Sequence, residues 1–95
     1  MSGHVFHPGH HPLHGITVAV MFRDARTLVG RFDRQDERGY HLLDVSMHDP
    51  ATGTGSREDF LRRTLKFGVN VEHPRLLVPV AQVEAMQPLR EVVIP

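Results

Sequence analysis

Three short apolar runs with a period of two, separated by tight polar turns, most constrain the fold of this chain. Alternate residues of a β-strand point to opposite faces, so such runs predict strands over residues 16–22, 27–34 and 40–47. The turns between them, residues 23–26 and 35–39, are short and almost entirely polar. Three strands joined by two tight turns predict an antiparallel meander. Gly30, inside the second strand, indicates a bend, a bulge or the close approach of another backbone.

The second half of the chain is less regular. Residues 48–56 contain proline and two glycines and predict a loop, after which Ser56 can cap a helix that we expect over 56–63. Strict alternation of apolar residues then predicts a strand over 65–72. Two shorter strands are expected over 76–80 and 83–87, and Pro79 requires the first of them to lie at an edge, a bulge or a strand end.

The predicted fold is mainly β: a small, strongly bent antiparallel β-barrel of five or six strands with a short helical insertion. A sheet this small buries its apolar face only by curling into a partly closed barrel or by packing in an oligomer. Three segments follow from this interpretation: a flexible arm rich in His, Gly and Pro over 1–15, the barrel domain over 16–88 with its insertion at 48–64, and a C-terminal tail over 89–95.

Composition excludes several classes of protein. The 95 residues suffice for one domain, and 11 Lys and Arg balance 11 Asp and Glu, which excludes a globally basic surface as the source of affinity. The absence of cysteine excludes disulfides, thiolate zinc sites and cysteine nucleophiles. No apolar run approaches the roughly 18–20 residues of a membrane helix, and no signal peptide precedes the domain, so we expect a cytoplasmic protein with no membrane partner.

Two segments carry short motifs that resemble the Sm/LSm family, which includes the Hfq-type RNA chaperones. The first reads Val18-Ala19-Val20-Met21-Phe22, Asp24-Ala25-Arg26, Leu28-Val29-Gly30, Phe32, Asp36 and Leu42-Leu43-Asp44-Val45. The second reads Leu77-Val78-Pro79-Val80, a one-turn kink at Ala81-Gln82, and Val83-Glu84-Ala85-Met86. The resemblance implies a bent small barrel, assembled as a ring through edge strands, that binds RNA.

This chain departs from the family's pattern at its functional turns. Ala25 replaces the glycine of an Asp-Gly-Arg turn, and Glu37-Arg38-Gly39 stands where the family carries a Met-Asn pair. Pro79-Val80 replaces the Arg-Gly of the second motif. The family's uridine site is therefore not carried over, and only Asp36 and Arg38 occupy the corresponding turn.

A nucleic-acid site is expected where arginines and aromatic rings stand on predicted loops. Residues 50–75 carry five basic against three acidic side chains, the only clear basic excess in the chain. Arginine would contact phosphate while an aromatic ring stacks on a base. The candidate residues are Asp36, Arg38, Tyr40, Arg62, Arg63, Phe67 and Arg75. Cations near a helix C-terminus are also favourable without any ligand, which is the alternative interpretation of Arg62 and Arg63.

The N-terminal arm holds five of the eight histidines: His4, His7, His10, His11 and His14. Imidazoles at a spacing of three residues share one side of a polyproline-type chain and are good ligands for zinc or nickel. A closed metal site also needs a fixed backbone, which an arm of this composition does not supply. No other cofactor is expected.

The pattern as a whole favours a non-catalytic binding module that forms a homo-oligomer, in ring form if the resemblance holds, and that binds RNA. No nucleophile elbow or phosphate loop occurs, so we do not expect an enzyme. Two alternatives stay open. One is a protein-interaction or assembly barrel without nucleic-acid binding, and the other is metal binding by the histidine arm.

Overall fold

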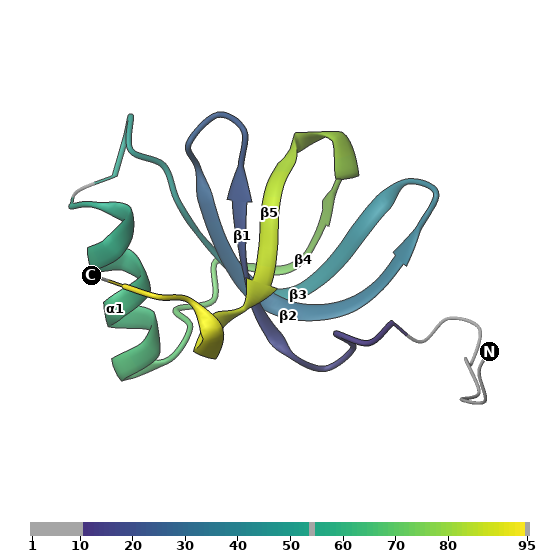
Figure 1. Ribbon diagram of the computed structural model, residues 1–95, viewed down its shortest axis with the longest axis horizontal. Helices are drawn as coiled ribbons and strands as arrows, with labels where there is room; N and C mark the ends of the chain where they lie inside the picture. Colours follow the sequence, from purple (N-terminus) through teal and green to yellow (C-terminus); the bar gives the residue numbers. More distant parts are fainter. Residues whose placement is uncertain (1–10, 54, 95) are drawn as a thin grey trace.

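The computed structural model describes residues 11–53 and 55–94 (Figure 1). Within them the elements are, in order, β1 Thr17–Phe22, β2 Thr27–Asp36, β3 Gly39–His48, α1 Arg57–Phe67, β4 His73–Val78, η1 Val80–Gln82, β5 Val83–Pro88 and η2 Leu89–Glu91, where η marks a 3₁₀ turn. The predicted mainly β class with one helix is confirmed.

The five strands form a single antiparallel sheet in the order β4-β3-β2-β1-β5. β1, β2 and β3 are the predicted meander, while β4 returns to pair with β3 and β5 pairs with β1. β4 and β5 form the two edges and are not paired with each other, so the sheet of the described residues is not closed. Figure 1 shows β2 and β3 curving along their length, but the expected barrel closure stays a prediction.

At Gly30, β3 packs tightly against β2. The register between the two strands shifts between Val29 and Arg31. A Cβ atom on Gly30 would lie only 2.9 Å from Cγ2 of Val45, so a side chain there would push β3 away. The predicted irregularity at this glycine is confirmed, both as a shift in register and as a close approach.

The two faces of the sheet are buried in two separate clusters. Because side chains alternate, β1 sends Val18 and Val20 into the inner core, where Phe32 and Leu42 are also fully or almost fully buried. Ala19, on the opposite face, belongs to an outer core with these residues: Val29, Leu61 and Leu89. Helix α1 therefore covers the outer face of the sheet with Leu61, which is 2% exposed.

Helix α1 begins as predicted but ends four residues later than predicted. The Oγ atom of Ser56 accepts a hydrogen bond from the backbone N–H of Asp59 at 3.1 Å, the expected N-cap. The helix continues to Phe67 and stops at Gly68, whose φ is +88° and whose N–H donates to the Thr64 carbonyl at 2.9 Å.

The strand predicted over 65–72 is wrong. Its first three residues complete α1, and residues 68–72 form an irregular connection to β4. The alternating apolar side chains at 65, 67 and 71 do not define a buried face: Leu65 is 47%, Phe67 75% and Val71 50% exposed. The end of the helix at Gly68, rather than the alternating pattern, determines the conformation of residues 65–72.

The last strands differ from prediction in detail. β4 starts at His73, three residues before the predicted strand, and Pro79 follows it directly, as a strand-end proline should. The one-turn kink expected at residues 81–82 is η1. The segment predicted as a tail folds back: η2 places Leu89 in the outer core, and Val92 and Ile94 pack against that cluster.

A candidate binding cavity beside the helix

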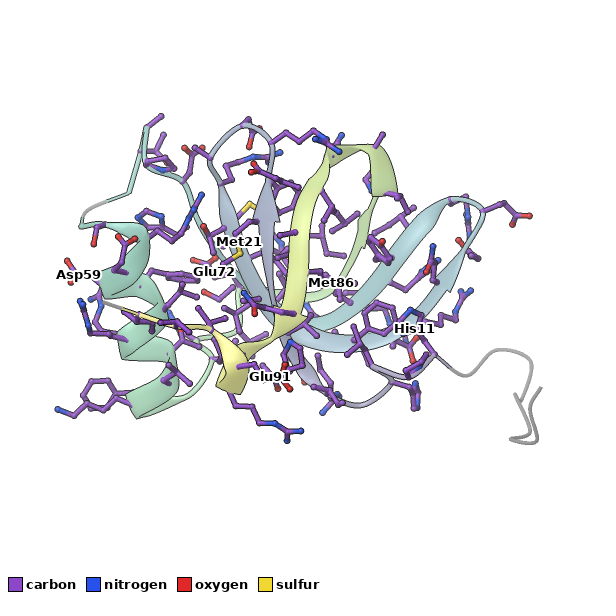
Figure 2. The ribbon with its side chains drawn as sticks, viewed as in Figure 1. His11, Met21, Asp59, Glu72, Met86 and Glu91 are labelled. Carbon is purple, nitrogen blue, oxygen red and sulfur yellow. The ribbon has the colours of Figure 1, made fainter. Side chains whose placement is uncertain are left out.

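A cavity of about 560 Å³ lies between α1, the end of β3 and the segments that connect α1 to its neighbours. We call it the α1 cavity, and its lining includes Ser46, His48, Phe60, Arg63, Phe67 and Glu72. Pockets for small molecules in proteins commonly measure roughly 300–1,000 Å³. Figure 2 shows Glu72 between α1 and the strands, and Asp59 on the far side of the helix.

His48, the last residue of β3, is the most unusual side chain of this cavity. It is 6% exposed, and its ring stacks on the ring of Phe60 with a centroid separation of 5.5 Å and an interplanar angle of 28°. Its Nε2 atom lies 3.2 Å from the carbonyl oxygen of Gly55. A carbonyl can only accept, so Nε2 carries the proton, and in the neutral ring Nδ1 keeps a free lone pair.

The Nδ1 atom of His48 is buried and has no hydrogen-bond partner among the described residues. Buried polar side-chain atoms are paired in the large majority of cases, so this atom is an exception among the described residues. In the neutral ring this atom is an acceptor, but its burial keeps it out of reach of a group in the cavity.

The loop after β3 holds the imidazole in place. The Asp49 carbonyl accepts hydrogen bonds from Gly53 N–H at 2.6 Å and from Thr52 N–H at 3.2 Å, which closes a tight turn. A Cβ atom on Gly53 would lie 2.9 Å from that carbonyl and 3.4 Å from Cδ2 of His48. Glycine thus allows the loop to pack directly on the ring.

Glu72, just before β4, also lines the cavity. Its Oε1 atom accepts the Met47 N–H at 2.9 Å, and its own N–H donates to the Val45 carbonyl at 2.8 Å. These two hydrogen bonds give the exposed carboxylate a defined place in the lining.

Cations and an exposed ring form the rim of the cavity at the C-terminal end of α1. Phe67 is 75% exposed, and Nζ of Lys66 lies 5.3 Å from the centroid of its ring. Arg63 lines the cavity and forms no ion pair within the described residues. Arg62, by contrast, bonds Asp59 through Nη1 at 3.3 Å. The rim thus presents positive charge and one aromatic face to solvent.

The structure divides the predicted nucleic-acid residues between two ends of the molecule. Arg62, Arg63 and Phe67 stand on α1, whereas Asp36, Arg38 and Tyr40 belong to the β2–β3 hairpin, and Figure 1 shows the two at opposite ends. Arg75 lies on β4 and lines a separate hollow of about 170 Å³ with Arg34 and His41, so it belongs to the hairpin end.

Asp36 is the centre of the hairpin end. Its carboxylate accepts the Arg38 N–H at 2.9 Å and an Arg34 guanidinium N–H at 2.9 Å, and His41 Nε2 lies 2.8 Å from it. Partial burial raises the pKa of this carboxyl, but the hydrogen bonds from Arg38, His41 and Arg34 outweigh that effect and lower the pKa to about 2. Asp36 therefore already has partners within the protein.

Tyr40 packs on the inner core instead of standing free as a stacking surface. It is half-buried, and its ring centroid is 5.8 Å from that of Phe32. Of the two aromatic candidates, only Phe67 offers an exposed face.

Of the histidine arm, His4, His7 and His10 lie outside the described residues. His11 packs on Phe32, with 4.5 Å between ring centroids, and its Nδ1 accepts the Leu13 N–H at 3.0 Å. His14 Nδ1 donates to the Asp33 carbonyl at 2.6 Å. No group of three or more metal-ligating side chains occurs within 11–53 and 55–94.

The residues that sequence reasoning missed are those that only the tertiary fold brings together: His48, Phe60 and Glu72. His48 ends one strand, Phe60 lies on the helix and Glu72 precedes another strand, so no local pattern links them. One sequence feature bears on His48: Gly53 follows it closely, and a glycine allows a loop to pack directly on a neighbouring side chain.

Comparison with known proteins gives no relative to argue from: no protein-family model matches the chain, and no curated protein does either. Among the described residues, no helix has the length and apolar character needed to cross a membrane.

Proposed function

We propose that this protein is a non-catalytic, Sm-like binding module that binds single-stranded RNA at the C-terminal end of α1. The observation that carries the proposal is the exposed ring of Phe67 beside Lys66 and Arg63, a cation without an ion pair in the described chain. Aromatic faces stack on bases of any sequence while nearby cations contact the phosphates. The Sm-like resemblance supports RNA as the ligand, although the binding surface lies away from the hairpin turn.

Fluorescence anisotropy with a labelled single-stranded RNA at low salt tests the proposal. Loss of a stacking aromatic costs about 1–3 kcal/mol per base, so Phe67→Ala should weaken binding roughly fivefold or more. Arg63→Ala should weaken it and flatten the salt dependence, because each phosphate contact on a single strand contributes about 0.7 to the slope.

The matched control lies at the other end of the molecule. Arg38→Ala removes an exposed arginine of the hairpin whose guanidinium is 3.9 Å from Asp36, and it should leave the affinity unchanged. If the RNA affinity falls with Arg38→Ala and not with the two α1 variants, the surface is wrongly assigned. If the wild-type protein binds no RNA at low salt, the proposal fails altogether.

The second candidate, an assembly module, is favoured by the open sheet. Each edge strand pairs on one side only, so its outer edge has no pairing strand in the described chain, and β4 carries Leu77, which is 40% exposed. An unpaired edge is a template for another strand, so β4 of one copy would pair with β5 of the next in a homo-oligomer, a ring if the rotation closes. Native mass spectrometry measures the subunit number directly. A strictly monomeric protein at all concentrations would exclude this assembly.

A further inference from the structure

A smaller hollow lies on three adjacent strands at the hairpin end of the molecule. Its volume is about 170 Å³, and its polar lining consists of Asp33, Arg34, His41 and Arg75. We call it the hairpin hollow. Sites that enclose whole small molecules commonly measure roughly 300–1,000 Å³. A hollow of this size therefore fits one polar group of a ligand rather than a complete small molecule.

The strand register brings the basic side chains of the hairpin hollow to one face of the sheet. Arg34 pairs with His41 across β2 and β3, and Arg75 pairs with Leu43 across β3 and β4. Leu42, between His41 and Leu43, is 1% exposed and belongs to the inner core. Because side chains alternate along a strand, His41 and Leu43 point away from that core, and residues paired directly opposite them share their face.

Arg75 is the cation of the hollow whose charge has no partner in the described chain. It is exposed, and its guanidinium forms no ion pair within residues 11–53 and 55–94. Neighbouring arginines differ: Nη1 of Arg34 donates to Asp36 at 2.9 Å, and Nη2 of Arg31 lies 3.3 Å from Asp44. The charge of Arg75 is therefore free to attract an anion.

Asp36 holds Arg34 and His41 in position. Its Oδ2 atom accepts a hydrogen bond from Arg34 at 2.9 Å and lies 2.8 Å from Nε2 of His41. A guanidinium carries more N–H groups than this one bond uses, so Arg34 keeps donors for a second partner. Among the described residues, Asp33 supplies the only carboxylate of the lining, and the two arginines outnumber it. The hollow is therefore positively charged.

We propose that the hairpin hollow binds a phosphate group through the guanidinium N–H groups of Arg75 and Arg34. A guanidinium offers parallel N–H groups that match two phosphate oxygens, and a dianion is attracted by both cations at once. The group enters either as inorganic phosphate or as the end of a phosphomonoester whose remainder stays outside the hollow. This site is separate from the proposed RNA surface on α1 and does not depend on it.

NMR titration of the wild-type protein with inorganic phosphate tests the proposal. We expect saturable shifts of the amide signals of Arg34, His41 and Arg75, and no such shifts with chloride at matched ionic strength. Acetate carries a single charge and should bind more weakly than phosphate. No saturable shift with phosphate, or equal binding of acetate, would overturn the inference.

Ribose 5-phosphate distinguishes the two sources of the phosphate group. Binding as tight as that of inorganic phosphate would show that the hollow takes the end of a phosphomonoester. Binding of inorganic phosphate alone would show that it takes the free ion. Both results assign the hollow to phosphate.

Three substitutions connect the binding to the hollow. Arg75→Ala removes the unpaired cation and should weaken phosphate binding about tenfold or more. Asp33→Asn removes the carboxylate of the lining and should tighten binding about two- to fivefold. Arg90→Ala, the control, removes an exposed arginine of η2 outside the hollow and should leave the affinity unchanged. Equal weakening by Arg75→Ala and Arg90→Ala, or no tightening by Asp33→Asn, would mean that phosphate responds only to net charge and would overturn the inference.

Discussion

Ala25 in the β1–β2 turn offers the sharpest test of the backbone geometry, because it holds a left-handed conformation with φ of +75°. That conformation brings Cβ close to the following carbonyl and costs a residue other than glycine roughly 1–2 kcal/mol. Glycine removes this cost but loses about 0.4–1 kcal/mol through its greater freedom in the unfolded chain. We therefore expect Ala25→Gly to raise the free energy of unfolding by about 0.5–1 kcal/mol.

The turn's other interactions should survive the substitution. Ala25 donates its N–H to the Phe22 carbonyl at 3.2 Å and accepts a hydrogen bond from Arg57 at 3.3 Å, and both groups belong to the main chain. In a domain of this size the change corresponds to a rise in Tm of about 2–8 °C, measurable by thermal denaturation followed by circular dichroism.

Ala85→Gly is the matched control for this experiment. Ala85 is exposed on β5 and is not among the positive-φ residues of the described chain, so the same substitution should lower the stability by about 0.5–1 kcal/mol. If both variants lose stability to the same extent, the left-handed conformation of Ala25 is absent in solution and the reasoning fails.

Three further outcomes can be measured by denaturation. Gly39→Ala would press a Cβ atom against the Val78 carbonyl, and urea unfolding should show a loss of about 2–3 kcal/mol. Leu61→Ala should cost about 2–4 kcal/mol by opening the outer core, whereas a loss below 1 kcal/mol would mean that α1 is not docked. Because the pKa of Asp36 is lowered from 3.8 to about 2, its contribution to stability is complete above pH 4 and is lost as the pH falls toward 2. Asp36→Asn should weaken that pH dependence, and an identical acid profile would argue against the hydrogen-bonded carboxylate.

The meander was predictable because its strands are amphipathic on a local scale. Val18, Val20 and Phe22 alternate along one strand, and the polar turns that follow leave no competing structure. The same rule failed over 65–72, where Leu65, Phe67 and Val71 are exposed although Val69 packs against the outer core. Gly68, whose N–H ends the helix, outweighed that pattern, and its role depends on a helix already present before it.

Only part of the candidate site could be predicted from the sequence. Arg63 and Phe67 could be singled out, because an arginine and an aromatic residue in a basic segment are a local signal. The division of the predicted nucleic-acid residues between two ends of the molecule could not be predicted, because it follows from the docking of α1 on the outer face of the sheet. The burial of His48 depends on Phe60 and on the Gly53 turn, which only the tertiary fold brings together.

The two separate cores determine which part of this protein we expect to unfold locally first. Inner and outer clusters share the sheet but no side chain, and the helix reaches the sheet through few anchors, chiefly Leu61 and the hydrogen bond from Arg57 to Thr27. We therefore expect helix α1 to detach as a cooperative unit while the meander stays intact. Its amides should exchange with deuterium well before those of β1 and β2, and a ligand in the α1 cavity would slow that exchange selectively.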